Sequence, residues 1–140
     1  MLKPQGIQLP DGSLYIGEMQ NNVPHGKGKV EYKQPDEWNR LSYDGDWVDG
    51  KRQGYGILTW ATENRRYEGQ WKDDYKDQGT ESWTQSVALG NGYSARVYQR
   101  QCEFTGTFKN DKWCDGVKKE DGKVVSNWKN GKYQENCIIS

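Results

Sequence analysis

Five tight-turn dipeptides recur in the chain at one fixed distance from the start of an aromatic-rich segment, and this spacing limits the fold more than any other feature. The segments start at residues 15, 43, 67, 104 and 124. The dipeptides follow six and seven residues later, as Asn21-Asn22, Asp49-Gly50, Asp73-Asp74, Asn110-Asp111 and Asn130-Gly131. Asn, Asp and Gly tolerate the positive φ that a two-residue hairpin turn requires. Each unit is therefore predicted to be a strand, a tight turn and a second strand.

The segment before each turn alternates rings with glycine. Four segments start with an aromatic residue and carry Gly at the third position: Tyr15-Ile-Gly17-Glu-Met19, Tyr43-Asp-Gly45-Asp-Trp47, Tyr67-Glu-Gly69-Gln-Trp71 and Phe104-Thr-Gly106-Thr-Phe108. The fifth, Val124-Val-Ser126-Asn-Trp128, keeps only the Trp and is predicted to be a terminal cap. Because strand side chains alternate faces, one face is predicted to be aromatic and the other charged. The glycine leaves a gap into which a neighbouring ring can lie flat.

The second strand is clear in the first two units, as Gly26-Lys-Gly28-Lys-Val30-Glu-Tyr32 and Gly54-Tyr-Gly56-Ile-Leu58-Thr-Trp60. In the third and fourth units it is degraded. There Gly79 and Gly116 come one residue late, and Glu81 and Lys118 replace the second glycine. No apolar i, i+3, i+4 stripe persists, so helices are not expected. The predicted fold class is all-β.

Composition and charge exclude several classes of protein. Aliphatic residues are few, but 7 Trp, 9 Tyr and 2 Phe can supply an ordered aromatic core. Lys plus Arg equals Asp plus Glu, at 20 each, which argues against a nucleic-acid partner and against membrane attachment by charge alone. The N-terminus lacks the apolar region of a secretory signal, and no apolar run is long enough to span a membrane. An odd, sparse set of 3 Cys suggests a reducing compartment, so we expect a cytoplasmic protein.

No residue pattern indicates catalysis. His25 is the single histidine, and no Ser or Cys near a base suggests a triad. Carboxylate pairs such as Asp73-Asp74 and Asp36-Glu37 fall in a turn and a loop, which explains them without acid–base chemistry. No Cys/His cluster suggests zinc. We expect no enzyme activity, no cofactor and no metal site.

The stretch from Tyr43 to Gly56 matches every fixed position of Tyr-x-Gly-x-Trp-x-x-Gly-x-x-x-Gly-x-Gly, and this pattern resembles the MORN repeat (membrane occupation and recognition nexus). The stretch from Tyr15 to Gly28 is similar, with Met19 for Trp and Asn22 for Gly. The resemblance covers residues 5 to 133. It implies an elongated, twisted antiparallel sheet of tandem hairpins, with a concave groove lined by the repeated aromatics. It also implies a scaffold that binds proteins, and for which lipid binding is sometimes proposed.

The resemblance divides the chain into a repeat domain, residues 1–133, and a flexible C-terminal tail, residues 134–140. The predicted units lie near 15–32, 43–60, 67–83, 104–119 and 124–133, and residues 6–13 look like the end of a preceding unit. A loop is added at 33–40. Residues 84–103 are predicted to be an inserted hairpin on a longer pair of strands. Because insertions in repeat proteins often lie on the binding face, this hairpin is a candidate for partner specificity.

The aromatic stripe has two interpretations. The rings can simply form the core of the sheet, or they can also floor a groove that receives a helix or an extended peptide of a protein partner. The candidate partner-binding residues are Tyr15, Tyr43, Trp47, Tyr67, Trp71, Phe104, Phe108 and Trp128. Two other functions stay open: a structural component of a ciliary or cytoskeletal assembly, and a regulatory module for an enzyme on another chain.

The chain ends in Cys137-Ile138-Ile139-Ser140, which fits the C-a-a-X pattern for farnesylation of Cys137. The alternative is a tail that ends this way by accident. One prenyl chain gives only marginal membrane binding, so a second contact would be needed. The balanced charge of the last units points to a protein partner for that contact.

Overall fold

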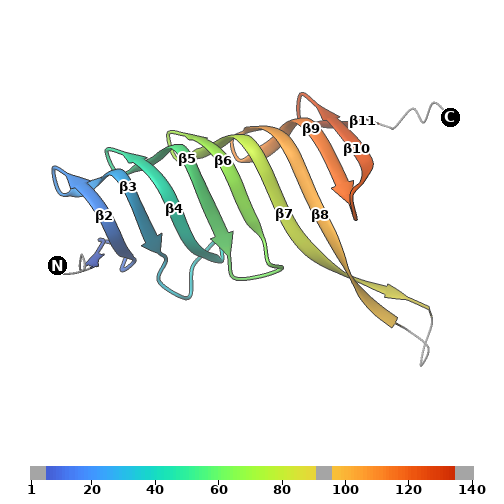
Figure 1. Cartoon of the computed structure of the whole chain (residues 1–140), viewed down its shortest axis with the longest axis horizontal. Coiled ribbons are helices and arrows are strands. Elements are labelled where there is room, and N and C mark those ends of the chain that lie inside the picture. The colour runs from blue at the N-terminus through green and yellow to red at the C-terminus, as the bar shows by residue number, and fades with distance from the viewer. Residues whose placement is uncertain (1–5, 91–95, 135–140) are drawn as a thin grey trace.

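The computed structural model describes residues 6–90 and 96–134, and in them 11 strands form one antiparallel sheet in chain order (Figure 1). The strands are β1 (Ile7–Gln8), β2 (Leu14–Gln20), β3 (Val23–Glu31), β4 (Arg40–Val48), β5 (Lys51–Trp60), β6 (Arg66–Lys72), β7 (Tyr75–Leu89), β8 (Arg96–Lys109), β9 (Lys112–Glu120), β10 (Lys123–Lys129) and β11 (Lys132–Gln134). The prediction of an elongated all-β sheet of tandem hairpins is confirmed.

Each of the five predicted turn dipeptides joins two consecutive strands, and both residues of each have positive φ. For example, φ is 48° at Asp73 and 72° at Asp74. A sixth turn of this kind, Asp121-Gly122, joins β9 to β10 and was not predicted. β1 pairs with β2 through Ile7 and Tyr15, as the second strand of a preceding unit would.

A row of glycines crosses the sheet from β2 to β9. Its members pair with one another in series: Gly17, Gly28, Gly45, Gly56, Gly69, Gly79, Gly106 and Gly116. The row corrects the alignment of the third and fourth units. Gly79 and Gly116 stand where Gly28 and Gly56 stand, so it is the first glycine that is missing there.

The correction has a simple cause. The second strands of the third and fourth units have one residue fewer between the turn and the glycine row than those of the first two units. Glu81 therefore does not replace a glycine. It pairs with Tyr67, just as Leu58 pairs with Tyr43, and Lys118 pairs with Phe104 in the same way. Two charged residues thus occupy the position that is apolar in the first two units.

The rings form a continuous ladder along the inner face of the sheet, defined here as the face that carries Tyr43. From Tyr15 to Phe108, consecutive ring centroids are 5.0–5.7 Å apart and the ring planes cross at 82–90°. Such edge-to-face pairs contribute about 0.5–1.5 kcal/mol each beyond the burial of their area. The rings were predicted to lie flat in glycine gaps. Tyr43 does lie against Gly56, but these ring–ring contacts are edge-on, and only further along do Phe104 and Trp113 stack flat, with planes 3° apart.

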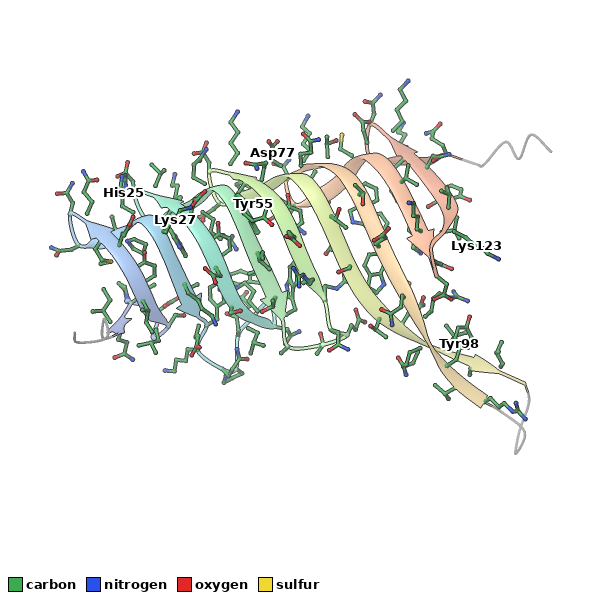
Figure 2. All side chains as sticks on the ribbon, viewed as in Figure 1. His25, Lys27, Tyr55, Asp77, Tyr98 and Lys123 are labelled. Carbon is green, nitrogen blue, oxygen red and sulfur yellow. The ribbon has the colours of Figure 1, made fainter. Side chains whose placement is uncertain are left out.

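Polar atoms of these rings bond to the backbone in a repeating way. The indole nitrogens of Trp47 and Trp71 donate to the carbonyl oxygens of Gly28 and Gly56, at 2.9 and 3.2 Å. Each of these bonds joins one unit to the unit before it. The outer face is polar, as predicted, and includes the ion pair of Lys27 with Asp46 at 2.8 Å (Figure 2).

β7 and β8 are the longest strands, and they extend past their neighbours as a two-stranded arm (Figure 1). Their pairing runs from Gln78–Thr107 to Leu89–Arg96 without a register shift. The arm corresponds to the predicted inserted hairpin, and residues 91–95 of that hairpin lie outside the described residues.

Candidate partner-binding groove

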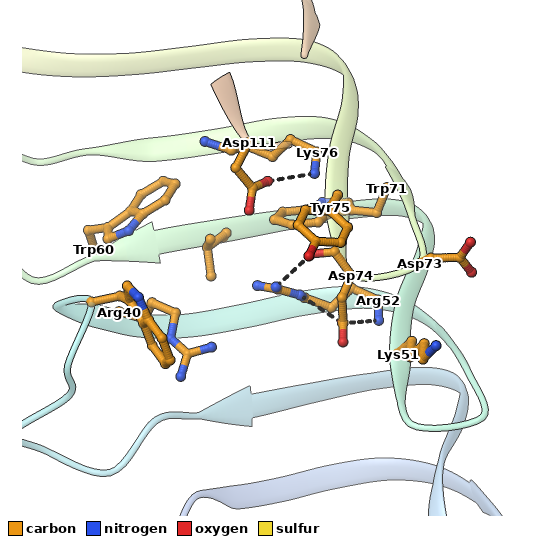
Figure 3. A pocket seen from close by; sticks show the side chains of 12 residues that line it. Arg40, Lys51, Arg52, Trp60, Trp71, Asp73, Asp74, Tyr75, Lys76 and Asp111 are labelled. Carbon is orange, nitrogen blue, oxygen red and sulfur yellow. Dashed lines mark hydrogen bonds and ion pairs between the residues drawn. The ribbon is translucent and has the colours of Figure 1, made fainter. Parts of the chain in front are cut away.

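A hollow of about 690 Å³ opens on the inner face between the second and third units (Figure 3). Its floor is apolar and comes from Leu58, Trp60 and Trp71. The sides carry mostly charged groups from three strands, the loop before β4 and two turns: Trp38, Arg40, Lys51, Arg52, Asp73, Asp74, Tyr75, Lys76 and Asp111. We call this hollow the groove.

Arg52 and Lys76 enter the groove because of their place in the hairpin. Each comes soon after a turn and pairs across the strand with Trp47 or Trp71, so its side chain shares the inner face with the rings. The Arg52 guanidinium lies 4.4 Å above the Trp71 ring. It also donates to Asp74, 3.2 Å to the carboxylate and 2.8 Å to the carbonyl oxygen. The wall of the groove is therefore held in a fixed shape.

Lys76 and Glu81 form a buried charged pair at one end of the groove. The Lys76 ammonium lies 5.1–5.8 Å from the centroids of Trp60, Tyr67 and Phe108 and 3.7 Å from the Glu81 carboxylate. Glu81 also accepts hydrogen bonds from Arg65 at 2.9 Å and from the Trp113 indole at 3.0 Å. Because a buried charge is costly without partners, this full set of contacts is what lets Glu81 occupy an apolar position.

The loop before β4 brings Trp38 to the edge of the groove. The Asp36 carboxylate accepts bonds from the Arg40 backbone at 2.8 Å and from two Arg40 guanidinium nitrogens at 3.0 Å each. The guanidinium in turn lies 4.0 Å from the centroid of Tyr32 and 4.7 Å from that of Trp38. The hydrogen bond from the Arg40 side chain lowers the pKa of Asp36.

We expect Asp36→Asn to lower the free energy of unfolding by about 1–2 kcal/mol near neutral pH, because hydrogen bonds to a charged group are lost. The pKa of Asp36 is lower in the folded state than in the unfolded state. The stability that the Asp36 carboxylate contributes is therefore fully present above the unfolded pKa and is lost as the pH falls through the folded pKa. Urea unfolding of both proteins over a range of acid pH should show the two stabilities converging. The control is Glu37→Gln, an exposed neighbour; an equal effect there would contradict the role of Asp36.

Most of the predicted partner-binding residues form the core. Tyr15, Tyr43, Tyr67 and Phe104 are 0% exposed, and Trp47, Trp71 and Phe108 are 3–6% exposed. A partner cannot touch the four fully buried rings unless the core opens. Trp71 lines the groove, and the half-buried Trp128 lines a smaller hollow of about 330 Å³ beside Trp113. Contact between a partner and these two residues stays a prediction.

The groove residues that sequence reasoning missed come from second strands and loops. Trp60 ends a second strand and stands two residues after Leu58, so the alternation of that strand could have placed it on the inner face. Trp38 lies in an added loop and carries no repeat signal. Arg52 and Lys76 follow turns, where charged residues are usually solvated, so their position over rings could not be inferred.

The other candidate residues have structural roles or lie outside the described part. His25, at the turn end of β3 (Figure 2), accepts a hydrogen bond from the backbone of Asp49 at 3.2 Å and so links the first two units. Among residues 6–90 and 96–134, no group of three or more His, Cys, Asp or Glu could hold a metal ion. No helix in that part is long and apolar enough to cross a membrane. Cys137 lies outside the described residues.

A family model for the MORN repeat matches residues 15–34, 43–65 and 67–77, which contain the hairpins of the first two units and the start of the third. The chain contains MORN repeats. MORN repeats generally mediate protein interactions. Beyond residue 77, the MORN hairpin pattern continues in the structure, because Gly106 and Gly116 pair in the fourth unit as Gly45 and Gly56 pair in the second.

Curated relatives share the repeat over part of their length. MORN repeat-containing protein 3 of Xenopus laevis is 35% identical over 71 residues, 47% of this chain and 28% of that protein. Phosphatidylinositol 4-phosphate 5-kinase 1 of Oryza sativa subsp. japonica is 36% identical over 55 residues, 39% of this chain and 6% of that protein. Human Alsin is 32% identical over 71 residues, 50% of this chain and 4% of that protein. This MORN-repeat chain thus spans at most 28% of these relatives.

Proposed function

We propose that this MORN-repeat chain is a non-catalytic scaffold whose groove binds a helix or an extended peptide of a partner protein. The observation that carries the proposal is the hollow between fixed charged walls, in which Trp60 is partly exposed while Leu58 and Trp71 beside it are only 3% exposed. Trp, Tyr and Arg are the residue types that contribute most to binding at protein interfaces. The groove concentrates all three, with Tyr75 52% and Trp38 61% exposed at its edges.

The walls also explain why we expect an apolar side chain of the partner to contribute most to binding in the groove. Arg40 is bonded to Asp36 and Arg52 to Asp74, so the main cations of the groove already have partners within the chain. No buried side-chain nitrogen or oxygen of the described residues lacks a hydrogen-bond partner. A partner therefore gains most by covering the exposed apolar surface of Trp60, Trp38 and Tyr75, and the charged rim serves to orient it.

Trp60→Ala is expected to weaken binding of the natural partner at least about tenfold, as loss of a central aromatic contact does. Trp38→Ala, on a more exposed ring, should weaken binding without disturbing the core. The measurement is quantitative mass spectrometry of proteins captured by wild-type and variant baits, followed by titration with the purified partner. The matched control is Tyr55→Ala on the outer face, where the side chain is 44% exposed. A partner lost with Tyr55→Ala but kept by both groove variants would place binding on the opposite face.

We also propose a cytoplasmic location with a weak lipid anchor at Cys137, supported by the terminal Cys-Ile-Ile-Ser pattern. The groove partner would then supply the second contact that a single prenyl chain needs. Cys137→Ser should move the protein from the membrane fraction to the soluble fraction of its native cell. Intact mass spectrometry is the direct measurement. An unmodified Cys137 with Ile138-Ile139-Ser140 still attached would reject the anchor.

A regulatory role beside an enzyme on another chain is the second candidate. The observation in its favour is that one relative, from Oryza sativa subsp. japonica, is named as a phosphatidylinositol 4-phosphate 5-kinase. In that case the partner held in the groove would itself be an enzyme, and the capture experiment with Trp60→Ala would identify it.

A further inference from the structure

The outer half of the arm is a two-stranded ribbon with two open edges. β6 pairs with β7 only as far as Ser82, and β9 pairs with β8 only from Cys102. Beyond these points, residues 84–89 and 96–101 pair only with each other. A hairpin of two strands is marginal in water and is stabilised by a third strand. This part of the arm is therefore a surface distinct from the groove and suited to strand addition.

The backbone groups that face outward can be assigned from two hydrogen bonds. The Thr84 nitrogen donates to the carbonyl oxygen of Glu63 at 2.7 Å, and the Gln101 nitrogen donates to the Asp121 carboxylate at 2.9 Å. Both bonds point away from the ribbon. Along a β-strand, the backbone N–H and C=O groups of alternate residues point to the same side. Val97 and Gln99 on β8 therefore point these groups outward, as Gln101 does. Neither makes a backbone hydrogen bond outside the ladder with any described residue.

Apart from Arg96 and Arg100, this edge lacks the usual protection against pairing. Natural edges are blunted by charged residues, proline or bulges. The arm contains no proline and no Lys, Asp or Glu from residue 84 to 101, and its register has no shift. Val97, on the β8 edge, is 66% exposed. A weakly protected and partly apolar edge is suited to pairing with another strand.

The charges of the arm select the kind of strand that would pair. Arg96 and Arg100 are the only charged residues between 84 and 101, and they lie with Tyr98 on one face of β8 (Figure 2 labels Tyr98). Glu120 is 3.0 Å from Arg100, but it is shared with Lys118 at 2.8 Å. Arg96 has no ion pair with a described residue. The edge therefore has an excess of positive charge.

We propose that the β8 edge at residues 96–100 receives an extended, acidic segment of a partner protein as an added strand. Residues of that strand opposite Arg96 and Arg100 would lie on the same face, about 4.5–5.5 Å away between Cβ atoms, where carboxylates pair with the guanidinium groups. A second copy of this chain fits less well. Two β8 edges paired along their whole length place Arg96 opposite Arg100, and like charges in that position repel.

The test uses the whole chain and a short synthetic peptide that alternates glutamate with valine, titrated by ¹⁵N–¹H NMR. The amide signals of Val97 and Gln99 should shift, and added salt should weaken the binding. Val97→Pro removes an outward N–H that has no partner in the sheet, a position where proline is tolerated. It should weaken binding at least about tenfold, through lost hydrogen bonds. The matched control, Ala88→Pro, makes the same change on the β7 edge and should alter affinity less than about twofold.

Arg96→Glu provides a second variant that leaves the backbone unchanged. It should reject the glutamate–valine peptide and accept one that alternates lysine with valine. The proposal is overturned if no amide shifts at millimolar peptide, if Val97→Pro binds as wild type does, or if wild type binds both peptides equally. Self-association of the wild type that Val97→Pro abolishes would make a second copy the occupant and would also overturn it. None of these results depends on the groove, which Trp60→Ala tests separately.

Discussion

Replacement of Trp47 by Ala is expected to lower the free energy of unfolding by about 3–5 kcal/mol, as for other large-to-small changes of a buried aromatic. Trp47 is 6% exposed and contacts the rings of Tyr15 and Tyr43, with centroids 5.7 and 5.0 Å away. Its indole also donates to the carbonyl oxygen of Gly28. The change therefore breaks the ring ladder and a hydrogen bond between the first two units at once.

The effect of Trp47→Ala is measured by urea unfolding followed by tyrosine and tryptophan fluorescence. Val48→Ala is the matched control, because Val48 is the next residue of β4 and is 42% exposed. It should change stability by no more than about 0.5 kcal/mol. A melting temperature of Trp47→Ala within about one degree of wild type would show that this ring does not support the fold.

Gly56→Ala is expected to cost about 3 kcal/mol, at the upper end of what overpacking a filled site usually costs. A Cβ at residue 56 would lie 2.1 Å from the Tyr43 hydroxyl oxygen and 2.3 Å from the ring carbon that bears it. Neither the backbone at Gly56 nor the ring of Tyr43 can move easily to relieve this overlap. Gly56 is paired with Gly45 on one strand and Gly69 on the other, and the Tyr43 ring is held between Trp47 and Trp71.

Gly122→Ala separates crowding from backbone strain. Gly122 has φ of +79°, which strains any other residue by about 1–2 kcal/mol, but nothing lies within 4 Å of an added Cβ. Both variants are compared with wild type by urea unfolding. If Gly56→Ala costs no more than Gly122→Ala, close approach of the Tyr43 ring is not the reason for the glycine row.

Much of the fold could be predicted because turn chemistry and face alternation are local properties. Asn, Asp and Gly at one offset defined five hairpin turns but missed the sixth, at Asp121-Gly122, and the ring positions defined the inner face. The alignment of Gly79 and Gly116 could not be derived from spacing alone. A strand can lose one residue at a bulge while its partner stays in register, and the sequence does not show where that happens.

The candidate site was less predictable than the fold. The repeated rings were correctly placed on one face, but repetition also gives each ring a neighbour that covers it, so Tyr43 and Tyr67 are fully buried. The accessible residues stand where the repeat is interrupted, such as Trp38 in an added loop. Glu81 was misassigned because of the one-residue shift in its strand, and its contacts could not be predicted either. Its partners Arg65 and Trp113 are 16 and 32 residues away, and no local pattern connects them.

The order of the strands in the sheet has a consequence for how the chain acquires its structure. Every strand pairs only with the strands before and after it in the sequence, so no contact in the sheet waits for a distant segment to arrive. The contact order is accordingly low for an all-β protein, and loop closure costs little entropy at each step. Folding can then begin at any hairpin and spread to its neighbours in either direction. Synthesis on the ribosome suits such a chain, because each emerging hairpin finds its partner already in place.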